Sequence, residues 1–270
     1  MSKVEIRGSR VAITGAGSGI GRATAIRCAR IGAEVVAIDI DPDSAQATAE
    51  TCQAVGAAAS SSYVCDVADA DAVEALAAGV ESEHGAVDVI VNNAGVGIYG
   101  PFLEASVGDW EWLRGVNLDG VVHGCHSFGQ RMIDRGHGHV VNIASGAGYI
   151  PNRNMAAYCA SKAAVVMLSQ CLRGDWDSRG VGVSVICPGV IATPIAANSR
   201  MAGSGAAKRD RAIKLLGRGH APDVVAKAVV SAVERNRELV PAGIESAAAY
   251  HLMRLSPASL RGLVAKATLP

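Results

Sequence analysis

The chain of 270 residues is 50% hydrophobic, which is enough for the core of one large α/β domain. Its 25 basic and 25 acidic side chains cancel, so the charge gives no reason to expect binding to nucleic acid or to an anionic membrane. The 7 cysteines include no Cys-x-x-Cys pair, which argues against a disulfide framework or a zinc site and for a reducing compartment. The first ten residues lack the apolar core of a signal peptide, and no apolar run approaches the ~18 residues of a membrane span. These features predict a soluble, cytoplasmic protein.

Short β-branched segments alternate with longer segments of helical spacing along the chain. We expect strands at 10–14, 34–39, 62–66, 87–93, 139–145, 182–188 and 238–241. Several are almost entirely apolar, as in strands of a parallel sheet that is covered on both faces. The Ala-rich segments between them have helical spacing. This alternation predicts an α/β fold with a Rossmann-type, doubly wound parallel β-sheet of about seven strands, flanked by helices, in a single domain over residues 1–270.

Two segments depart from this alternation. Residues 194–220 mix Gly, Ser and charged residues without a clear period, which predicts a mobile substrate lid. Residues 244–270 have a helical period that breaks at Ser256–Pro257. We expect this C-terminal tail to close the substrate pocket or to pack against another subunit, with contact to a membrane surface as the less favoured alternative.

A glycine-rich segment, TGAGSGIG at 14–21, lies where the first strand is predicted to lead into the first helix. Its glycines allow a tight turn and a close approach of the backbone, and the helix N-terminus offers N–H groups to a pyrophosphate. Asp39 ends the second strand about twenty residues later, where a carboxylate can accept hydrogen bonds from an adenosine ribose. Asp39 would repel a 2′-phosphate, and neither Ile40 nor Ser18 supplies a cation. The segment therefore favours NAD over NADP.

The segment YCASK places Tyr158 and Lys162 one turn apart on the same face of a mostly apolar helix. Taken alone, a Tyr-x-x-x-Lys pattern is common by chance, and a tyrosine at the rim of a core beside a solvated lysine explains it. Its context decides between this interpretation and a catalytic one.

The motifs TGAGSGIG, NNAG (92–95), Ser145 and YCASK follow one another in this order, and Ser145 precedes Tyr158 by thirteen residues. The segment PGVIATP (188–194) follows the sixth predicted strand. Together these motifs, over roughly residues 8 to 241, resemble the short-chain dehydrogenase/reductase family. The resemblance implies a Rossmann-type sheet, a nicotinamide cofactor, a small-molecule alcohol or ketone as substrate, and assembly into a homotetramer or a dimer.

The same resemblance assigns roles to individual residues of this sequence. It implies a catalytic set of Asn117, Ser145, Tyr158 and Lys162. It implies that the cofactor is bound, together with Tyr158 and Lys162, by Gly15, Ser18, Gly19, Ile20, Gly21, Asp39, Ile40, Asp66, Val67, Asn93, Ala94, Gly95, Pro188, Gly189, Ile191 and Thr193. At the edge of the substrate pocket, beside Ser145 and Tyr158, it implies Gly97, Ile98, Ala147 and Ile150, with Tyr99 nearby.

The chemistry explains why a phenol and an ammonium group would be paired. Hydride transfer between an alcohol carbon and nicotinamide requires a proton to leave or reach the oxygen. A phenol with a pKa of about 10 is a poor base near neutrality, and lowering that pKa by about three units takes roughly 4 kcal/mol. One positive charge at about 4 Å, with an effective dielectric constant of about 20, supplies that much. Lys162 and an oxidised nicotinamide ring are both sources of such a charge.

The other members of the set have supporting roles in this hypothesis. Ser145 would hold the substrate oxygen by a hydrogen bond and stabilise the charge that develops there. By resemblance, Asn117 would bend its helix locally and hold a water in a proton relay towards Lys162. A metal site built on His123, Cys125 and His126 is not favoured, because no further ligands cluster with them.

The sequence thus predicts an NAD-dependent enzyme that interconverts a secondary alcohol and its ketone, with Tyr158 as acid and base. The predicted pocket edge has few charges, which favours a lipophilic substrate. Two alternatives stay open: an NADP-linked carbonyl reductase, and a non-catalytic module that senses NAD(H) and signals to a partner protein.

Overall fold

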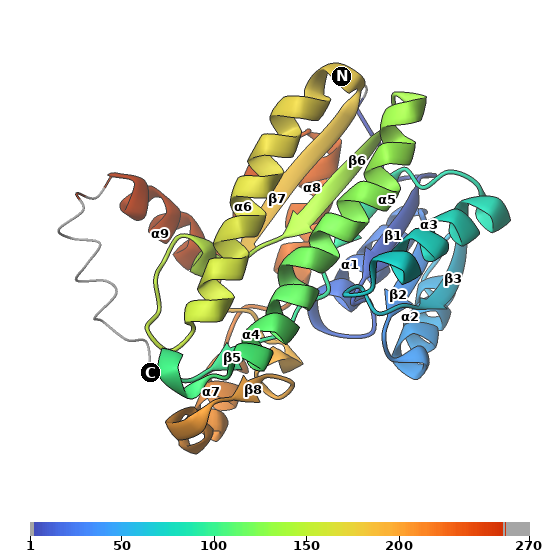
Figure 1. Ribbon diagram of the computed structural model, residues 1–270. Helices are drawn as coiled ribbons and strands as arrows, with labels where there is room; N and C mark the ends of the chain where they lie inside the picture. Colours follow the sequence, from blue (N-terminus) through green and yellow to red (C-terminus); the bar gives the residue numbers. More distant parts are fainter. Residues whose placement is uncertain (1–2, 256, 258–270) are drawn as a thin grey trace.

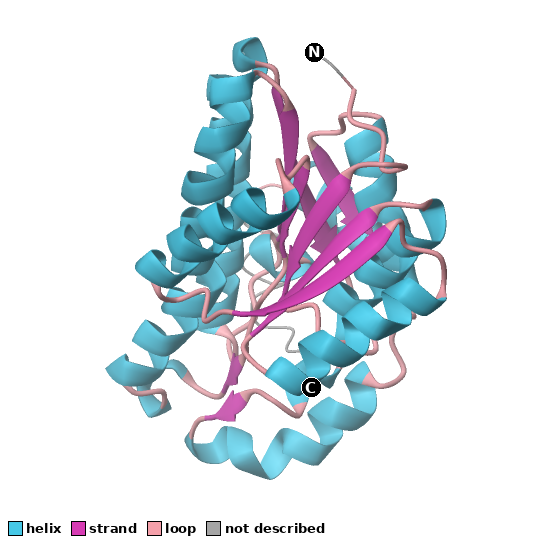
Figure 2. Ribbon diagram, turned by 90° about the vertical axis from the view of Figure 1, so that its right-hand side faces the viewer, coloured by secondary structure: helices cyan, strands magenta, loops and turns pink. Residues whose placement is uncertain are grey.

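The computed structural model describes residues 3–255 and residue 257. Within these residues the chain forms a seven-stranded sheet between two layers of helices (Figures 1 and 2). All neighbouring strands of this sheet are parallel. Their spatial order is β3 (Ala59–Val64), β2 (Glu34–Asp39), β1 (Arg10–Thr14), β4 (Val89–Asn92), β6 (Gly138–Ile143), β7 (Val181–Pro188) and β9 (Leu239–Ala242). The direction of winding reverses between β1 and β4, and doubly wound sheets bind their ligands at such a point.

Each face of the sheet has its own apolar core because successive side chains of a strand point to opposite faces. In β1, Val11 and Ile13 belong to one buried cluster and Ala12 belongs to the other. The first cluster is covered by α1 (Gly19–Ile31), α2 (Pro42–Ala54) and α8 (Asp223–Glu234). The second is covered by α3 (Ala70–His84), α5 (Gly120–Arg135) and α6 (Ala156–Trp176).

The third strand lies earlier in the chain than its predicted position at 62–66. β3 starts at Ala59 and ends at Val64, and its residues are exposed or half-buried. As the edge strand it pairs with β2 alone among the strands of this sheet, so its serines can face solvent. The search for apolar runs therefore missed the serine-rich first half of the strand.

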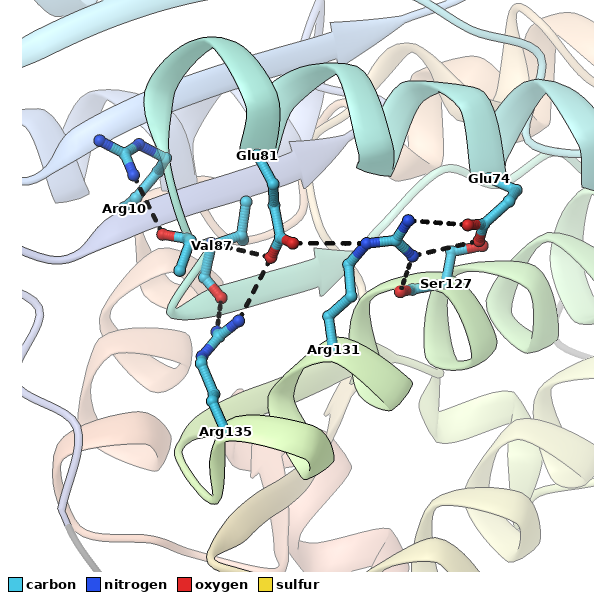
Figure 3. Close-up of polar contacts among 8 residues, drawn as sticks. Arg10, Glu74, Glu81, Val87, Ser127, Arg131 and Arg135 are labelled. Atoms are coloured by element: carbon cyan, nitrogen blue, oxygen red, sulfur yellow. Dashed lines mark hydrogen bonds and ion pairs between the residues drawn. The ribbon is translucent and has the colours of Figure 1, made fainter.

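An ion-pair network fastens α3 to α5 in the second helical layer (Figure 3). The Arg131 guanidinium lies between two carboxylates, 2.7 Å from Glu74 Oε1 and 3.4 Å from Glu81 Oε2. Arg135 Nη1 lies 3.2 Å from Glu81 Oε1, and its other terminal nitrogen donates to the carbonyl of Val87 just before β4. The network thus joins both helices to the start of a central strand.

The predicted lid at 194–220 contains a short strand and a helix. β8 (Arg200–Met201) pairs in parallel with β5 (Ile98–Tyr99), and α7 (Arg209–Leu216) follows. Arg200 forms an ion pair at 3.0 Å with Asp109 and lies 3.9 Å over the ring of Trp112, both in α4 (Val107–Arg114). The short strands and α7 lie together beyond the carboxyl end of the main sheet (Figure 1). Whether this segment moves stays a prediction.

The predicted tail is described in its first half, where α9 (Ile244–Leu255) extends from β9. The rest of that prediction, residue 256 and residues 258–270, lies outside the described residues. Among the described helices, none is both long enough and apolar enough to span a bilayer.

Candidate active site

The glycine turn connects β1 to α1 as the sequence predicts. Gly15 and Gly19 have left-handed φ angles of 63° and 52°, which favour glycine. A Cβ on Gly21 would lie 2.1 Å from the carbonyl oxygen of Gly15, so any side chain at this position would clash with the backbone of the turn. Ser18 is the N-cap of α1, and its side chain makes no capping hydrogen bond. The turn therefore keeps a narrow backbone cradle at a helix N-terminus, which fits a pyrophosphate.

A threonine that the sequence analysis did not single out joins this turn to the end of β4. Thr14 Oγ1 accepts hydrogen bonds from the backbone N–H groups of Asn93 at 2.9 Å and Ala94 at 3.1 Å. The Asn93 side chain donates in return to the carbonyl of Thr14 at 2.8 Å. The predicted cofactor residues Asn93 and Ala94 are thus brought against the predicted glycine turn. The sequence offered one signal for the role of Thr14, namely a hydroxyl side chain at the end of a mostly apolar strand.

Asp39 lies at the end of β2 and faces the glycine turn. Its Oδ2 accepts from the backbone N–H of Gly17 at 2.8 Å, and its Oδ1 accepts from that of Asp41 at 3.2 Å. The carboxylate therefore supports the turn while its negative charge stays beside the cradle. Ile40 follows with 64% of its surface exposed and offers no charge.

Asp66 and Val67 follow β3 near the amino end of α5. Asp66 is exposed, and its Oδ1 accepts from the backbone N–H of Ala68 at 2.9 Å. Val67 is buried, and its carbonyl lies 2.9 Å from Nδ1 of His123. His123 thus has a structural hydrogen bond. The described residues contain no group of three or more His, Cys, Asp or Glu side chains placed to hold a metal ion.

Ser145, Tyr158 and Lys162 converge as predicted. Ser145 follows β6 and caps a 3-10 turn, with its Oγ accepting from the backbone N–H of Ala147 at 3.2 Å. Its hydroxyl also forms a hydrogen bond with the Tyr158 phenol. Lys162 is 97% buried, donates from Nζ to the carbonyl of Ile143 at 2.9 Å, and lies 5.9 Å from the centre of the Tyr158 ring.

Burial is the largest cause of the pKa shifts in this group. Burial raises the pKa of the Tyr158 phenol above its ordinary value, and the hydrogen bond with Ser145 opposes that rise in part. The Lys162 ammonium group donates to the Ile143 carbonyl, and it lies 5.9 Å from the centre of the phenol ring. Burial lowers the pKa of Lys162 itself from 10.5 to about 8.

Asn117 lies in the π-helical turn Gly115–Asp119, which joins α4 to α5. The regular α-helix is thus interrupted at Asn117, and π-helical turns are frequent at functional sites. The Asn117 amide accepts from the backbone N–H of Val96 at 2.8 Å and donates to its carbonyl at 2.9 Å. It also donates to the hydroxyl of Ser161 at 3.3 Å, a residue that the sequence analysis missed. A Cβ on Gly95 would lie 3.4 Å from Asn117 Oδ1 and 3.5 Å from Lys162 Nζ, so the two polar groups meet beside this glycine.

The segment from Pro188 to Thr193 runs between the glycine turn and the serine. A Cβ on Gly19 would lie 3.2 Å from Thr193 Cγ2, and a Cβ on Gly146 would lie 3.4 Å from the Pro188 carbonyl oxygen. Gly189 donates its backbone N–H to Ala242 at 2.8 Å, and Ile191 is buried. The structure therefore places this segment along the path from the pyrophosphate cradle to Ser145.

The predicted pocket-edge residues have different surroundings. Ile98 is 3% exposed and packs in an apolar cluster with Leu113 and Ala157, so its side chain is part of a core. A Cβ on Gly97 would lie 2.3 Å from the Ser199 hydroxyl, so the lid segment touches this glycine. Ala147 lies within the 3-10 turn after Ser145 and Ile150 follows that turn, and both are half-buried. Nearby, a hollow of about 370 Å³ is lined by Tyr99, Gly100, Pro101, Phe102, Arg153, Asn154, Ser204 and Gly205.

A doubly wound sheet with a glycine cradle at its switch point, and beside it a Ser–Tyr–Lys group whose lysine is buried, defines a dinucleotide-dependent oxidoreductase. The model of the short chain dehydrogenase family matches residues 9–203. The chain belongs to this family of oxidoreductases.

Curated relatives and a solved structure agree with the family. "Probable oxidoreductase EphD" of Mycobacterium tuberculosis (strain ATCC 25618 / H37Rv) is 46% identical over 259 residues, covering 93% of this chain and 44% of that protein. The chain thus spans less than half the length of this relative. D-threitol dehydrogenase of Mycolicibacterium smegmatis is 40% identical over 222 residues, 81% of this chain and 83% of that protein.

Among solved structures, a short-chain dehydrogenase/reductase from Burkholderia phymatum in complex with NAD superimposes with a TM-score of 0.86. It is 33% identical, and the match covers 93% of this chain and 94% of that one. Other similar structures hold NADP, so the comparisons establish a nicotinamide dinucleotide for the family without choosing between the two.

Proposed function

We propose that the protein interconverts a secondary alcohol and its ketone with NAD as the hydride carrier. The observation that carries this proposal is the convergence of Ser145, Tyr158 and Lys162 at the end of the segment that leads from the glycine cradle. Acid–base catalysis at an alcohol oxygen needs such a group, and nucleotide binding alone does not.

Each polar group has a defined task in alcohol oxidation. The Ser145 hydroxyl holds the substrate oxygen next to the Tyr158 phenol, to which it is already hydrogen-bonded. Tyr158 accepts the hydroxyl proton in oxidation and returns it in reduction. Lys162 keeps a positive charge in the buried site, which favours the phenolate form. When bound, the nicotinamide ring supplies the hydride-accepting carbon.

The preference for NAD rests on Asp39. Its carboxylate faces the glycine turn, where it would meet the adenosine ribose of a bound dinucleotide and repel a 2′-phosphate. Gly17 contacts this carboxylate and Ile40 follows Asp39 in the chain, and neither residue carries a positive charge. An NADP-linked reductase is the alternative, and the ratio of dissociation constants for NADH and NADPH decides between them.

The chemical character of the substrate is open to test. The small and apolar residues Gly97, Ala147 and Ile150 support a lipophilic alcohol. The hollow beside them carries Tyr99, Asn154 and the cation of Arg153, which supports a substrate with further polar groups. The substrates to be compared therefore range from apolar secondary alcohols to polyols.

The first experiment measures reduction of NAD and of NADP across this range, with Tyr158→Phe as the matched variant. Activity with NAD that is lost by at least a hundredfold in the variant supports the proposal. If the wild type binds NADH but converts no alcohol or ketone, the sensing module becomes the better hypothesis, since it needs no acid–base group.

We also propose that the protein forms a homodimer or homotetramer, on the strength of the family resemblance. Light scattering coupled to size-exclusion chromatography measures the mass of the assembly directly. A monomer at micromolar concentration would contradict this proposal.

A further inference from the structure

The first turn of α9 contacts three segments that surround the candidate site. Glu245 and Ser246 are the residues involved, and we call this pair the α9 clamp. The clamp lies outside residues 9–203, which the family model matches. α9 follows β9 in the chain, and Figure 1 shows it on the side where α6 begins.

The Glu245 carboxylate connects the cofactor segment to the end of the lid. Its Oε1 accepts the backbone N–H of Val190 at 2.9 Å. Its Oε2 lies 2.8 Å from Nε2 of His220, the last residue of the predicted lid. His220 is also joined to the same segment through the backbone, because it donates to the Val190 carbonyl at 2.9 Å and accepts from Ala192 at 2.9 Å.

Ser246 connects the same helix turn to the serine loop. Its hydroxyl donates to the carbonyl of Cys187 at 2.7 Å, just before Pro188. The phenol of Tyr149, four residues after Ser145, donates to the Ser246 carbonyl at 2.9 Å. Ser246 is 2% exposed, so these bonds are shielded from water.

The contacted segment has little room to adopt another position. A Cβ on Gly189 would lie 2.2 Å from Glu245 Oε1, so the glycine lets the backbone approach the carboxylate. On its other side, the segment faces Gly19 through Thr193 and Gly146 through Pro188. The clamp therefore acts on the length of chain that lies between the pyrophosphate cradle and Ser145.

We propose that the α9 clamp, through Glu245, positions the Pro188–Thr193 segment for the nicotinamide half of the cofactor. Glu245 is a positioning residue in this proposal, since it acts through the backbone of Val190. The inference rests on the proposed nicotinamide-dependent function. It adds that the contribution of the clamp to binding is confined to one half of the dinucleotide, because the adenosine half lies at β2 and the glycine turn.

The test compares NADH with ADP-ribose, which lacks the nicotinamide ring. Both dissociation constants are measured by calorimetry for the wild type, Glu245→Ala and Glu245→Gln, with the exposed Glu50→Ala in α2 as the control. We expect Glu245→Ala to weaken NADH binding about tenfold and ADP-ribose binding less than twofold. The variant loses the hydrogen bond from Val190 to a charged carboxylate, and in this proposal that bond positions only the segment for the nicotinamide half. The neutral amide of Glu245→Gln can still accept from Val190. We therefore expect a smaller change, of about threefold, in the ratio of the NADH to the ADP-ribose dissociation constant.

The outcomes separate this inference from the proposed function. If the wild type binds neither NADH nor NADPH, the proposed function fails. If it binds NADH and the ratio of the two constants is unchanged in both Glu245 variants, the clamp inference is overturned while the function stands. An equal loss for NADH and ADP-ribose also overturns it, because a general loss of structure weakens both ligands. If Glu245→Ala does not fold, the ratio in Glu245→Gln decides.

Discussion

The buried ammonium group of Lys162 destabilises the fold by an amount that can be measured. Its pKa falls from 10.5 to about 8, and burial is the largest cause. One pKa unit corresponds to 1.36 kcal/mol, so at pH 7 the charged form lowers the free energy of unfolding by about 3 kcal/mol. Replacing Lys162 by Met removes that charge and keeps an unbranched side chain in the same space. It also removes the donor to the Ile143 carbonyl, which costs about 1–3 kcal/mol at any pH.

The pH dependence separates the two effects. Between pH 8 and pH 10.5 the unfolded chain holds the lysine proton and the folded chain has released it, so the stability of the wild type rises with pH in this window. The Met variant has no such proton. We expect the wild-type minus variant difference in free energy of unfolding to rise by about 2.5 kcal/mol from pH 7 to pH 10.

Urea unfolding at the two pH values measures this difference. The control is Lys227→Met, since Lys227 is 63% exposed on α8 and paired with Asp223 at 3.2 Å. Its difference from the wild type should stay constant within about 0.5 kcal/mol. A Lys162→Met difference that is equally flat would refute the reasoning, because it would mean that the lysine titrates alike in the folded and unfolded chains.

Three further predictions follow from contacts in the structure. Thr14→Val leaves two half-buried backbone N–H groups without their acceptor, so unfolding by urea should show a loss of about 1–3 kcal/mol, with weaker NADH binding. Asp39→Ser removes the charge that opposes a 2′-phosphate, and the ratio of NADPH to NADH dissociation constants should fall at least tenfold; an unchanged ratio would contradict the assignment. Arg131→Met should lower stability by about 1 kcal/mol, because Glu74 loses its ion-pair partner and Glu81 keeps only Arg135, whereas Arg114→Met in the exposed pair with Asp119 should have almost no effect.

The sheet could be predicted where apolar periodicity determines it. The first, second, sixth and seventh strands of the main sheet were located to within one residue at each end, because strands buried on both faces consist almost entirely of apolar residues. The edge strand β3 was placed too late because serines are tolerated where one side of the ladder is free. The two-residue strands β5 and β8 could not be foreseen. Two paired residues carry no period, and their pairing joins segments about one hundred residues apart.

The candidate site was predictable as a set of residues but not as an electrostatic arrangement. The family resemblance, which rests on the order and spacing of the motifs, implied Ser145, Tyr158, Lys162 and Asn117, and the structure brings these residues together. The sequence placed Lys162 as the charge that lowers the pKa of Tyr158. Side-chain rotamers decide whether the Lys162 ammonium group points at the Tyr158 phenol or at the Ile143 carbonyl at the end of β6. The spacing of residues along a helix does not determine these rotamers.

The residues that the sequence analysis missed share a physical property, because their bonding partners include main-chain atoms. Thr14 accepts from backbone amides 79 and 80 residues away, Glu245 accepts from one 55 residues away, and Ser246 donates to a carbonyl 59 residues away. Every residue except proline offers the same N–H and C=O groups, so the partner's identity leaves no trace in the sequence. A motif can therefore name the side chains that meet the substrate, whereas the contacts that hold the loops between them are decided by topology. This explains why α9, beyond the last recognisable motif, can still determine the geometry of the site.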